Sequence, residues 1–211
     1  MDNRLITSTL RPEDISNESN IRPQSLQEYV GQGKVKENIE VFMKKIEFTK
    51  ADRNDIDEIF DMFRYTIEEM NANGIPQWDE IYPCRDDLLH DMEQQELYVG
   101  KIEGKAAVAY VLNQKCDDEY QNGTWLYPDA NYYVIHRLCV SSHFQKQGIG
   151  TRTVQYIEEQ AKNMGAETIR LDAFTLNPHA LKLYEKLGYK EVGVANFRKG
   201  KFYLMEKKLS G

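Results

Sequence analysis

Two observations predict a mixed α/β fold in one domain that begins near Ile46. First, short apolar runs typical of strands alternate with stretches of helical periodicity from Ile46 onward. Second, the chain of 211 residues, 41% of them hydrophobic, is long enough for one well-buried domain and an extension. Pro12, Pro23, Gly31 and Gly33 punctuate the segment before Ile46. Residues 1–45 are therefore predicted to form a helical, partly mobile N-terminal extension, and residues 46–211 the domain.

Each element follows from the spacing of apolar residues and from turn signals between them. In the extension, apolar residues share one helical face over residues 34–45. The domain begins with a strand over 46–49, and Asp52 and Asp55 then open a helix that Asn73-Gly74 ends. The elements expected after it are a helix over 86–94, a hairpin of strands 97–102 and 106–112, a polar loop over 115–129, a strand over 132–140, a helix over 148–164, a strand over 168–173, a helix over 179–187, and strands over 189–194 and 202–207.

Charge and cysteine content exclude several classes of protein. The net charge of −7 is concentrated between Ala51 and Glu96, which hold 14 Asp or Glu against 3 Arg. This balance argues against nucleic-acid binding and fits a cationic acceptor beside an anionic cofactor, although acidic residues can equally well solvate a helix. The cysteines lack C-x-x-C spacing and the histidines are scattered, so we expect free thiols, no metal site and a cytoplasmic protein. No apolar run approaches the about 20 residues that span a bilayer.

A glycine-rich turn between a predicted strand and a predicted helix is the strongest local signal. The segment from Gln145 to Gly150 reads Q-x-x-G-x-G, which differs from the motifs of dinucleotide folds and P-loops. Gly148 and Gly150 allow a tight bend and close approach to a ligand. Backbone N–H groups at a helix N-terminus converge on an anion. The turn therefore predicts an anion-binding site.

A second motif lies downstream and reads Asn177-x-x-Ala180-x-x-x-Tyr184-x-x-x-Gly188-Tyr189. The two motifs at this separation resemble the GNAT acetyltransferase superfamily, over about residues 46–209. The resemblance implies a mostly antiparallel central sheet flanked by helices, acetyl-coenzyme A (acetyl-CoA) as the donor and a primary amine as the usual acceptor. It implies no metal.

The resemblance also implies how the donor is held. Strand 132–140 is expected to splay from its neighbour, so that unpaired backbone groups bind the pantetheine arm and an N–H near Leu138 polarises the thioester carbonyl. The pyrophosphate is expected on the glycine-rich turn. Cys139 lies near the expected thioester but has no basic partner, so we interpret it as a core residue. The cofactor-binding residues implied in this way are Leu138, Cys139, Val140, Gln145, Lys146, Gln147, Gly148, Ile149, Gly150, Thr151, Asn177 and Tyr184.

Two side chains are candidates for proton transfer. The resemblance places Tyr184 as the general acid that protonates the thiolate leaving group; the alternative is a tyrosine whose hydroxyl is hydrogen-bonded for structure. His136, two residues before Leu138 on one strand, is expected to share its face and is a candidate general base. Tyr133, Arg137, an acidic residue of the first half or ordered water are rivals for that role. Asn177 either contacts pantetheine or caps the last helix, and both roles can coexist.

The acceptor is the least predictable part. The loop over residues 73–83 carries Trp78, Tyr82 and two carboxylates, which suit an ammonium held by charge and cation–π contact. Tyr133 is a third candidate contact. Alternatively, the aromatic residues of the loop cap the core. A small-molecule amine and a peptide amine are both open as acceptors, and a homodimer is possible.

The first 45 residues resemble the start of RuvB, the Holliday-junction branch-migration motor, from Arg4 to Asp14 and from Ile21 to Asn38. No phosphate-binding loop follows, which argues against ATPase activity. The segment can be functional, a remnant or an artefact. Two alternative functions follow from this N-terminal segment. One is an acyl-CoA sensor or adaptor that docks through the segment. The other is a fragment of a DNA-repair motor, and the net negative charge of the chain argues against it.

Overall fold

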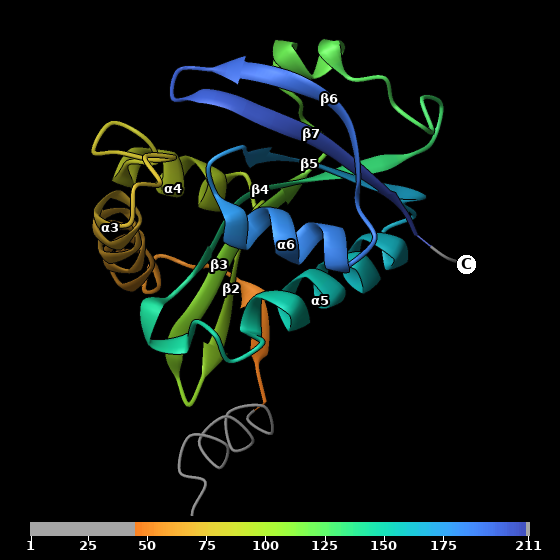
Figure 1. Cartoon of the computed structure of the whole chain (residues 1–211). Helices are drawn as coiled ribbons and strands as arrows, with labels where there is room; N and C mark the ends of the chain where they lie inside the picture. The colour runs from red at the N-terminus through yellow and green to blue at the C-terminus, as the bar shows by residue number, and fades with distance from the viewer. Residues whose placement is uncertain (1–44, 210–211) are drawn as a thin grey trace, which may run out of the picture. The chain divides into compact units, whose positions relative to one another are not determined.

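A computed structural model describes residues 45–209 of the chain (Figure 1). Seven strands form one sheet in the order β1-β2-β3-β4-β5-β7-β6. The strands are β1 (Glu47–Lys50), β2 (Leu97–Ile102), β3 (Lys105–Asn113), β4 (Tyr132–Val140), β5 (Thr168–Phe174), β6 (Lys190–Phe197) and β7 (Gly200–Lys208). The helices are α3 (Ile56–Ala72), α4 (Arg85–Glu93), α5 (Ile149–Asn163) and α6 (Pro178–Lys186), with 3-10 helices η2 (Asp118–Asn122) and η3 (Ser142–Phe144).

The predicted mixed, mostly antiparallel sheet is confirmed, because every strand pair is antiparallel except β4 with β5. The helices and strands predicted from periodicity lie within a few residues of those observed. The helix over 34–45 and the segment that resembles RuvB lie outside the described residues, apart from Lys45.

Helices cover the sheet on both faces (Figure 1). The apolar residues of α3 recur at helical spacing and pack with α4, β2 and β3 in one buried cluster. A second cluster joins α5 and α6 to β5 and to the opposite side of β3. Alternate residues of a strand point to opposite faces, so Ala109 and Val111 join the first cluster and Tyr110 and Leu112 the second.

The sheet opens between its two central strands. The parallel ladder of β4 with β5 joins Tyr132–Ile135 to Thr168–Leu171 and goes no further. Beyond Ile135, β4 continues with β3 on one side, while β5 continues with β7. The backbone edge of residues 136–140 therefore faces a gap in the sheet, as the resemblance implied.

A β-bulge in β4 overturns one prediction. Val111 lies opposite His136 and Ala109 lies opposite Cys139, so two β4 residues, Arg137 and Leu138, stand where one is expected. Arg137 has a φ of 51°, in the left-handed region. The expectation that His136 shares a face with Leu138 was wrong, because the extra residue breaks the alternation. His136 lies on the α3 face with Cys139.

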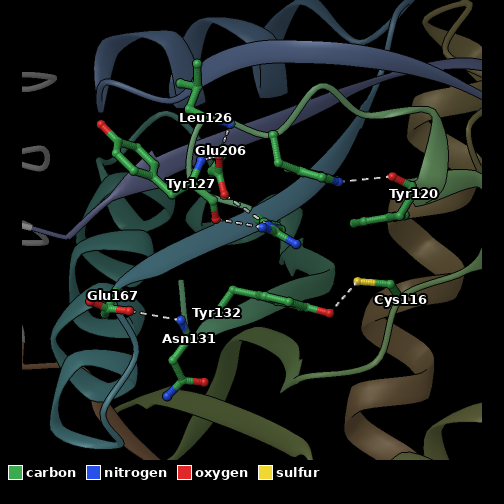
Figure 2. Close-up of polar contacts among 10 residues, drawn as sticks. Cys116, Tyr120, Leu126, Tyr127, Asn131, Tyr132, Glu167 and Glu206 are labelled. Atoms are coloured by element: carbon green, nitrogen blue, oxygen red, sulfur yellow. Dashed lines mark hydrogen bonds and ion pairs between the residues drawn. The ribbon is translucent and has the colours of Figure 1, made fainter. Parts of the chain in front are cut away.

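The segment between β3 and β4 was predicted as a polar loop, but it contains η2 and is anchored on the sheet. Arg170 of β5 and Glu206 of β7 are cross-strand neighbours, and the Arg170 Nε donates to Glu206 at 3.0 Å. The other Glu206 oxygen accepts from the backbone N–H groups of Leu126 at 2.7 Å and Tyr127 at 3.2 Å (Figure 2). A buried ion pair thus satisfies the backbone of a loop that would otherwise have no partner there.

Aromatic rings complete this anchor. The Arg170 guanidinium lies 4.2 Å from the ring centroid of Trp125 and 4.0 Å from that of Tyr132. The Trp125 indole N–H donates to the backbone oxygen of Tyr120 at 3.1 Å (Figure 2). Tyr120 in η2 is therefore fixed on the sheet through the loop, although nothing in its sequence neighbourhood predicts this.

Replacing Glu206 with glutamine is expected to destabilise the protein by about 3–5 kcal/mol, because it leaves the buried Arg170 charge without a counter-charge. The glutamine amide can replace only one of the two oxygens, and its NH₂ group would face N–H donors. Urea unfolding followed by circular dichroism measures the loss. The matched control is Glu47→Gln in the exposed pair with Lys45, for which we expect less than about 1 kcal/mol. Equal losses in the two variants would contradict the role of the anchor.

Candidate active site

A cavity of about 990 Å³ lies at the gap between β4 and β5. Its lining comes from both faces of the sheet. The glycine-rich turn and α6 contribute Lys146 and Leu183 on one face, and α3 and the loop over residues 73–83 contribute Met70 and Trp78 on the other. The cavity therefore connects the two faces through the opening in the sheet.

The turn before α5 has the backbone that an anion site requires. Gly148 is the N-cap residue of α5 with a φ of 76°, and Lys146 has a φ of 61°. The first helical hydrogen bond runs from the N–H of Arg152 to the Gly148 oxygen at 3.0 Å. The N–H groups of residues 149–151 precede that bond and have no carbonyl partner one turn earlier. They are available to an anion, beside a helix dipole of favourable sign.

Side chains of the turn hold its shape. The Gln145 amide donates to the Val140 oxygen at 3.2 Å, and the Gln147 amide donates to the His143 oxygen at 3.0 Å. Of the predicted cofactor-binding residues, all line the cavity except Gln147. The amide of Gln147 instead braces η3 against the turn.

Replacing Gly148 with alanine is expected to weaken acetyl-CoA binding about tenfold. An alanine is roughly 1–2 kcal/mol less stable than glycine in a left-handed backbone conformation. The variant must adopt that conformation to direct the turn N–H groups at the anion, so the binding free energy falls by about this amount. In the matched variant Gly150→Ala, the new Cβ would meet Leu183 at 3.4 Å and Val140 at 3.8 Å, which are ordinary contacts. We expect its affinity to change by less than about threefold. Isothermal titration calorimetry measures both, and the reverse order of effects would refute this account of the turn.

Asn177 and Tyr184 of the second motif are held in different ways. Asn177 is the N-cap of α6, and its side-chain oxygen accepts from the N–H of Ala180 at 3.1 Å, so the predicted capping role is confirmed. Tyr184 lines the cavity, and its hydroxyl has no hydrogen-bond partner among residues 45–209. Burial, and then the nearby Asp172 carboxylate, raise the pKa of the Tyr184 phenol above its ordinary value. The phenol is therefore protonated at neutral pH.

Cys139 is buried on the α3 face, and its thiol donates to the Thr66 hydroxyl at 3.4 Å. Burial raises the pKa of this thiol to about 12. A thiol that stays protonated is a poor nucleophile. These observations support the interpretation of Cys139 as a core residue.

The loop over residues 73–83, here called the strap, lines the cavity and is held by side-chain hydrogen bonds at three points. The Asn177 amide donates to the Gln77 side chain at 2.9 Å. Asp79 accepts from the Arg198 guanidinium through two bonds of 2.7 Å, and this contact is the largest cause that lowers the pKa of Asp79. The Tyr82 hydroxyl accepts from the Arg137 Nε at 2.9 Å. The strap thus joins α6, the β6–β7 turn and the bulge in β4.

The three predicted acceptor residues have different surroundings. Trp78 and Tyr82 both line the cavity. Trp78 also packs on Phe63, with ring centroids 5.3 Å apart, so part of this aromatic surface does cap the core. Tyr133 does not line the cavity; it packs on the α5 and α6 cluster. The cavity lining does not support Tyr133 as an acceptor contact, because the residue precedes the opening and packs on that cluster.

His136 lines the cavity and lies half-buried. Its Nε2 is 3.1 Å from the Asn113 side-chain oxygen and 3.2 Å from the backbone oxygen of Lys115. A carbonyl oxygen only accepts, so Nε2 carries a proton and its lone pair is on Nδ1. Burial lowers the pKa of His136, which is therefore neutral near pH 7.

Asp172 is the site residue that sequence reasoning missed. It lies on β5 just beyond the opening, lines the cavity, and accepts from the Tyr120 hydroxyl at 2.8 Å. Burial raises the pKa of the Asp172 carboxyl to about 6; the Tyr120 hydrogen bond opposes this rise and the charge of Asp117 adds to it. The sequence signal that could have indicated Asp172 is an aspartate within a largely apolar strand, where a charged residue is exceptional. It stands five residues before Asn177.

Residues 45–209 contain neither a group of metal-binding side chains nor a helix that could span a membrane. In that part of the chain, no three His, Cys, Asp or Glu side chains are grouped so as to hold a metal ion. None of its helices is long and apolar enough to cross a membrane.

Comparisons with known proteins identify the family and support the fold. The sequence matches the Acetyltransferase (GNAT) family over residues 59–189. It is 26% identical over 144 residues to the uncharacterized N-acetyltransferase YesJ of Bacillus subtilis (strain 168), covering 66% of this chain and 78% of that protein. A crystal structure of a GNAT-family acetyltransferase from Streptococcus agalactiae 2603 has a TM-score of 0.72 and 24% identity, and the match covers 79% of this chain and 96% of that one.

A further similar structure is that of YncA from Salmonella typhimurium with its cofactor acetyl-CoA. Its TM-score is 0.56 at 16% identity, and the match covers 78% of this chain and 94% of that one. At these identities the two structures support the fold.

Proposed function

Because the chain belongs to the GNAT family of acetyltransferases, we propose that it is an N-acetyltransferase that moves an acetyl group from acetyl-CoA to a primary amine. The observation that carries this proposal is the cavity through the sheet. An anion-binding turn lines it on one face, and a carboxylate and aromatic rings line it on the other. Such a cavity allows an amine to reach a thioester held in the opening.

The residues on the α5 and α6 face fit the donor. The N–H groups of residues 149–151 suit the pyrophosphate, and Lys146, Lys182 and Lys186 add positive charge along the same side. The open backbone edge of residues 136–140 suits the amides of the pantetheine arm, as an added strand does. Bound acetyl-CoA would supply an acetyl group on a thioester. The backbone N–H of Leu138 is our candidate donor to its carbonyl oxygen.

Asp172 is the proposed general base. The base takes one proton from the bound ammonium, because an ammonium has no lone pair for attack. The nitrogen then bonds to the acetyl carbon while the carbon–sulfur bond breaks and the thiolate takes a proton from the general acid. The second proton, which the nitrogen loses as the amide forms, restores that acid. A carboxyl with a pKa of about 6 is ionised at neutral pH yet basic enough to accept that proton. His136 is the weaker candidate, because its Nε2 already donates to a carbonyl oxygen and only Nδ1 could accept.

Tyr184 is the proposed general acid. Its phenol is protonated, faces the cavity and is not committed to another hydrogen bond among the described residues. It can therefore give a proton to the thiolate that leaves. Asp172 and Tyr184 lie close enough for the carboxylate to affect the pKa of the phenol, so base and acid belong to one site.

The test combines a binding measurement with a turnover measurement. Acetyl-CoA at about 100 times its Kd is expected to stabilise the protein by about 2.7 kcal/mol, seen as a rise in melting temperature. Release of free thiol from acetyl-CoA, followed across a panel of primary amines, reports transfer. Binding without thiol release from any amine would favour the alternative, a sensor or adaptor that binds acyl-CoA. No stabilisation at millimolar acetyl-CoA would contradict both functions.

A further inference from the structure

The acceptor half of the cavity carries a continuous apolar wall. It is made of five residues from α3, the strap, β5, β6 and β7, all of which line the cavity: Met70, Ile75, Phe174, Phe197 and Phe202. The rings of Phe197 and Phe202 meet edge to face at 5.2 Å, and those of Phe174 and Phe202 lie 4.9 Å apart. An apolar wall of this kind suits a ligand with an apolar body.

The wall begins beside the proposed base. Asp172 and Phe174 are two residues apart on β5 and so share one face of the sheet. Phe174 pairs with Phe202 across the β5–β7 ladder, which extends the wall away from the carboxylate. A molecule with its nitrogen at Asp172 would therefore lay the rest of its length against the wall.

Cations on this half of the cavity already have partners. Arg137 is paired with Asp91 and donates to Tyr82. Arg198 and Lys199 share the carboxylate of Asp79. Asp91 balances Arg137, and the two cations at Asp79 leave a single net positive charge, at the β6–β7 turn, that could attract the carboxylate of an amino acid or peptide.

Asp172 and Asp117, in contrast, are cavity carboxylates without an ion-pair partner among residues 45–209. Asp172 accepts from a neutral hydroxyl, and Asp117 lines the cavity near it. Both carboxylates line the same cavity as Tyr82. Burial is the main cause that raises the pKa of Tyr82; Arg137 opposes this rise, and the charges of Asp172 and Asp117 add to it. The acceptor half of the cavity therefore has negative charge at Asp172 and an apolar surface beyond it.

We propose that the acceptor is a primary monoamine with an apolar, aromatic or long aliphatic body, whose ammonium group binds at Asp172 and whose body packs on the apolar wall. This inference rests on the proposed transferase function. The second ammonium group of a polyamine that extends along the wall would lose its hydration there and meet only apolar side chains. A peptide would bring polar backbone groups to the same surface.

The experiment measures kcat/KM from thiol release, with the full chain and saturating acetyl-CoA. The amines are ethylamine, hexylamine, phenethylamine, spermidine and a dipeptide. We expect phenethylamine and hexylamine to exceed ethylamine by at least about tenfold, since one or more apolar groups enter a pocket. Fastest turnover of spermidine or the dipeptide would overturn the acceptor class while leaving the transferase function intact. Thiol release with none of the amines, despite binding of acetyl-CoA, would instead count against the transferase function.

Phe197→Ala tests whether the preference for an apolar amine depends on the wall. Phe197 is half-buried, so Phe197→Ala is expected to fold, and acetyl-CoA binding verifies that it does. Its KM for phenethylamine should rise about tenfold, and by more than its KM for ethylamine. The control is Tyr65→Ala, an aromatic truncation at an exposed residue of α3 that does not line the cavity. Equal losses for both amines in Phe197→Ala would remove the wall from acceptor binding.

Discussion

Replacing Asp172 with asparagine is expected to lower kcat about 10²–10⁴-fold, the range that general bases contribute. The amide has nearly the shape of the carboxyl and can still accept from the Tyr120 hydroxyl, but it cannot take a proton from the amine. Affinity for acetyl-CoA should stay within about threefold of the parent, because the donor is held on the other face. His136→Gln serves as the matched control and should reduce kcat much less. A larger loss in His136→Gln than in Asp172→Asn would assign the base to His136.

The pH dependence gives this prediction a second readout. The base must be ionised, so kcat/KM should rise with pH through a midpoint of about 6, the pKa of the Asp172 carboxyl. Asp172→Asn should abolish that limb. Tyr120→Phe removes a hydrogen bond that lowers the pKa of Asp172, so its midpoint should move to higher pH. A midpoint that does not move would mean that the limb reports another group, such as His136.

Replacing Tyr184 with phenylalanine is expected to lower kcat about 10²–10⁴-fold with little change in acetyl-CoA affinity. The substitution removes only a hydroxyl that has no partner among the described residues, so the packing of the ring on Tyr189, with centroids 5.5 Å apart, is kept. Steady-state kinetics with a saturating amine, together with calorimetry for acetyl-CoA, separate turnover from binding.

The control for Tyr184→Phe is Tyr65→Phe on the exposed surface of α3, which should leave kcat unchanged. A donor analogue whose leaving thiol is more acidic needs less help from an acid, and it should restore part of the lost rate. Unchanged turnover in Tyr184→Phe would remove Tyr184 from the acid role.

The sequence predicted the elements well because their signals are local. Helical spacing in α3, the glycines before α5 and the cap at Asn177 each depend on residues within a few positions of one another. The donor side of the cavity is built from two such segments, and so it could be predicted from the chain. The acidic stretch over 51–96, with its 14 Asp or Glu, did not point to the proposed base, because Asp172 lies outside it.

The acceptor side could not be predicted in the same way, because it depends on register and on distant contacts. One extra residue at Arg137–Leu138 moved His136 to the other face, and no residue type marks a bulge of this kind. Asp172 became a candidate only when β5 was seen to pass the opening, and Tyr120 reaches it from a segment 52 positions away. The apolar wall likewise combines five elements that are far apart in the sequence.

The opening between β4 and β5 has a consequence for the order of events in turnover. If the donor and the amine occupy opposite faces, each can enter and leave without displacing the other. The protonated, buried thiol of Cys139 offers no covalent carrier for the acetyl group between them. Both substrates must then be bound at once, and double-reciprocal plots should intersect instead of running parallel. The opening between β4 and β5 would thus lead to a kinetic mechanism in which both substrates bind before either product leaves.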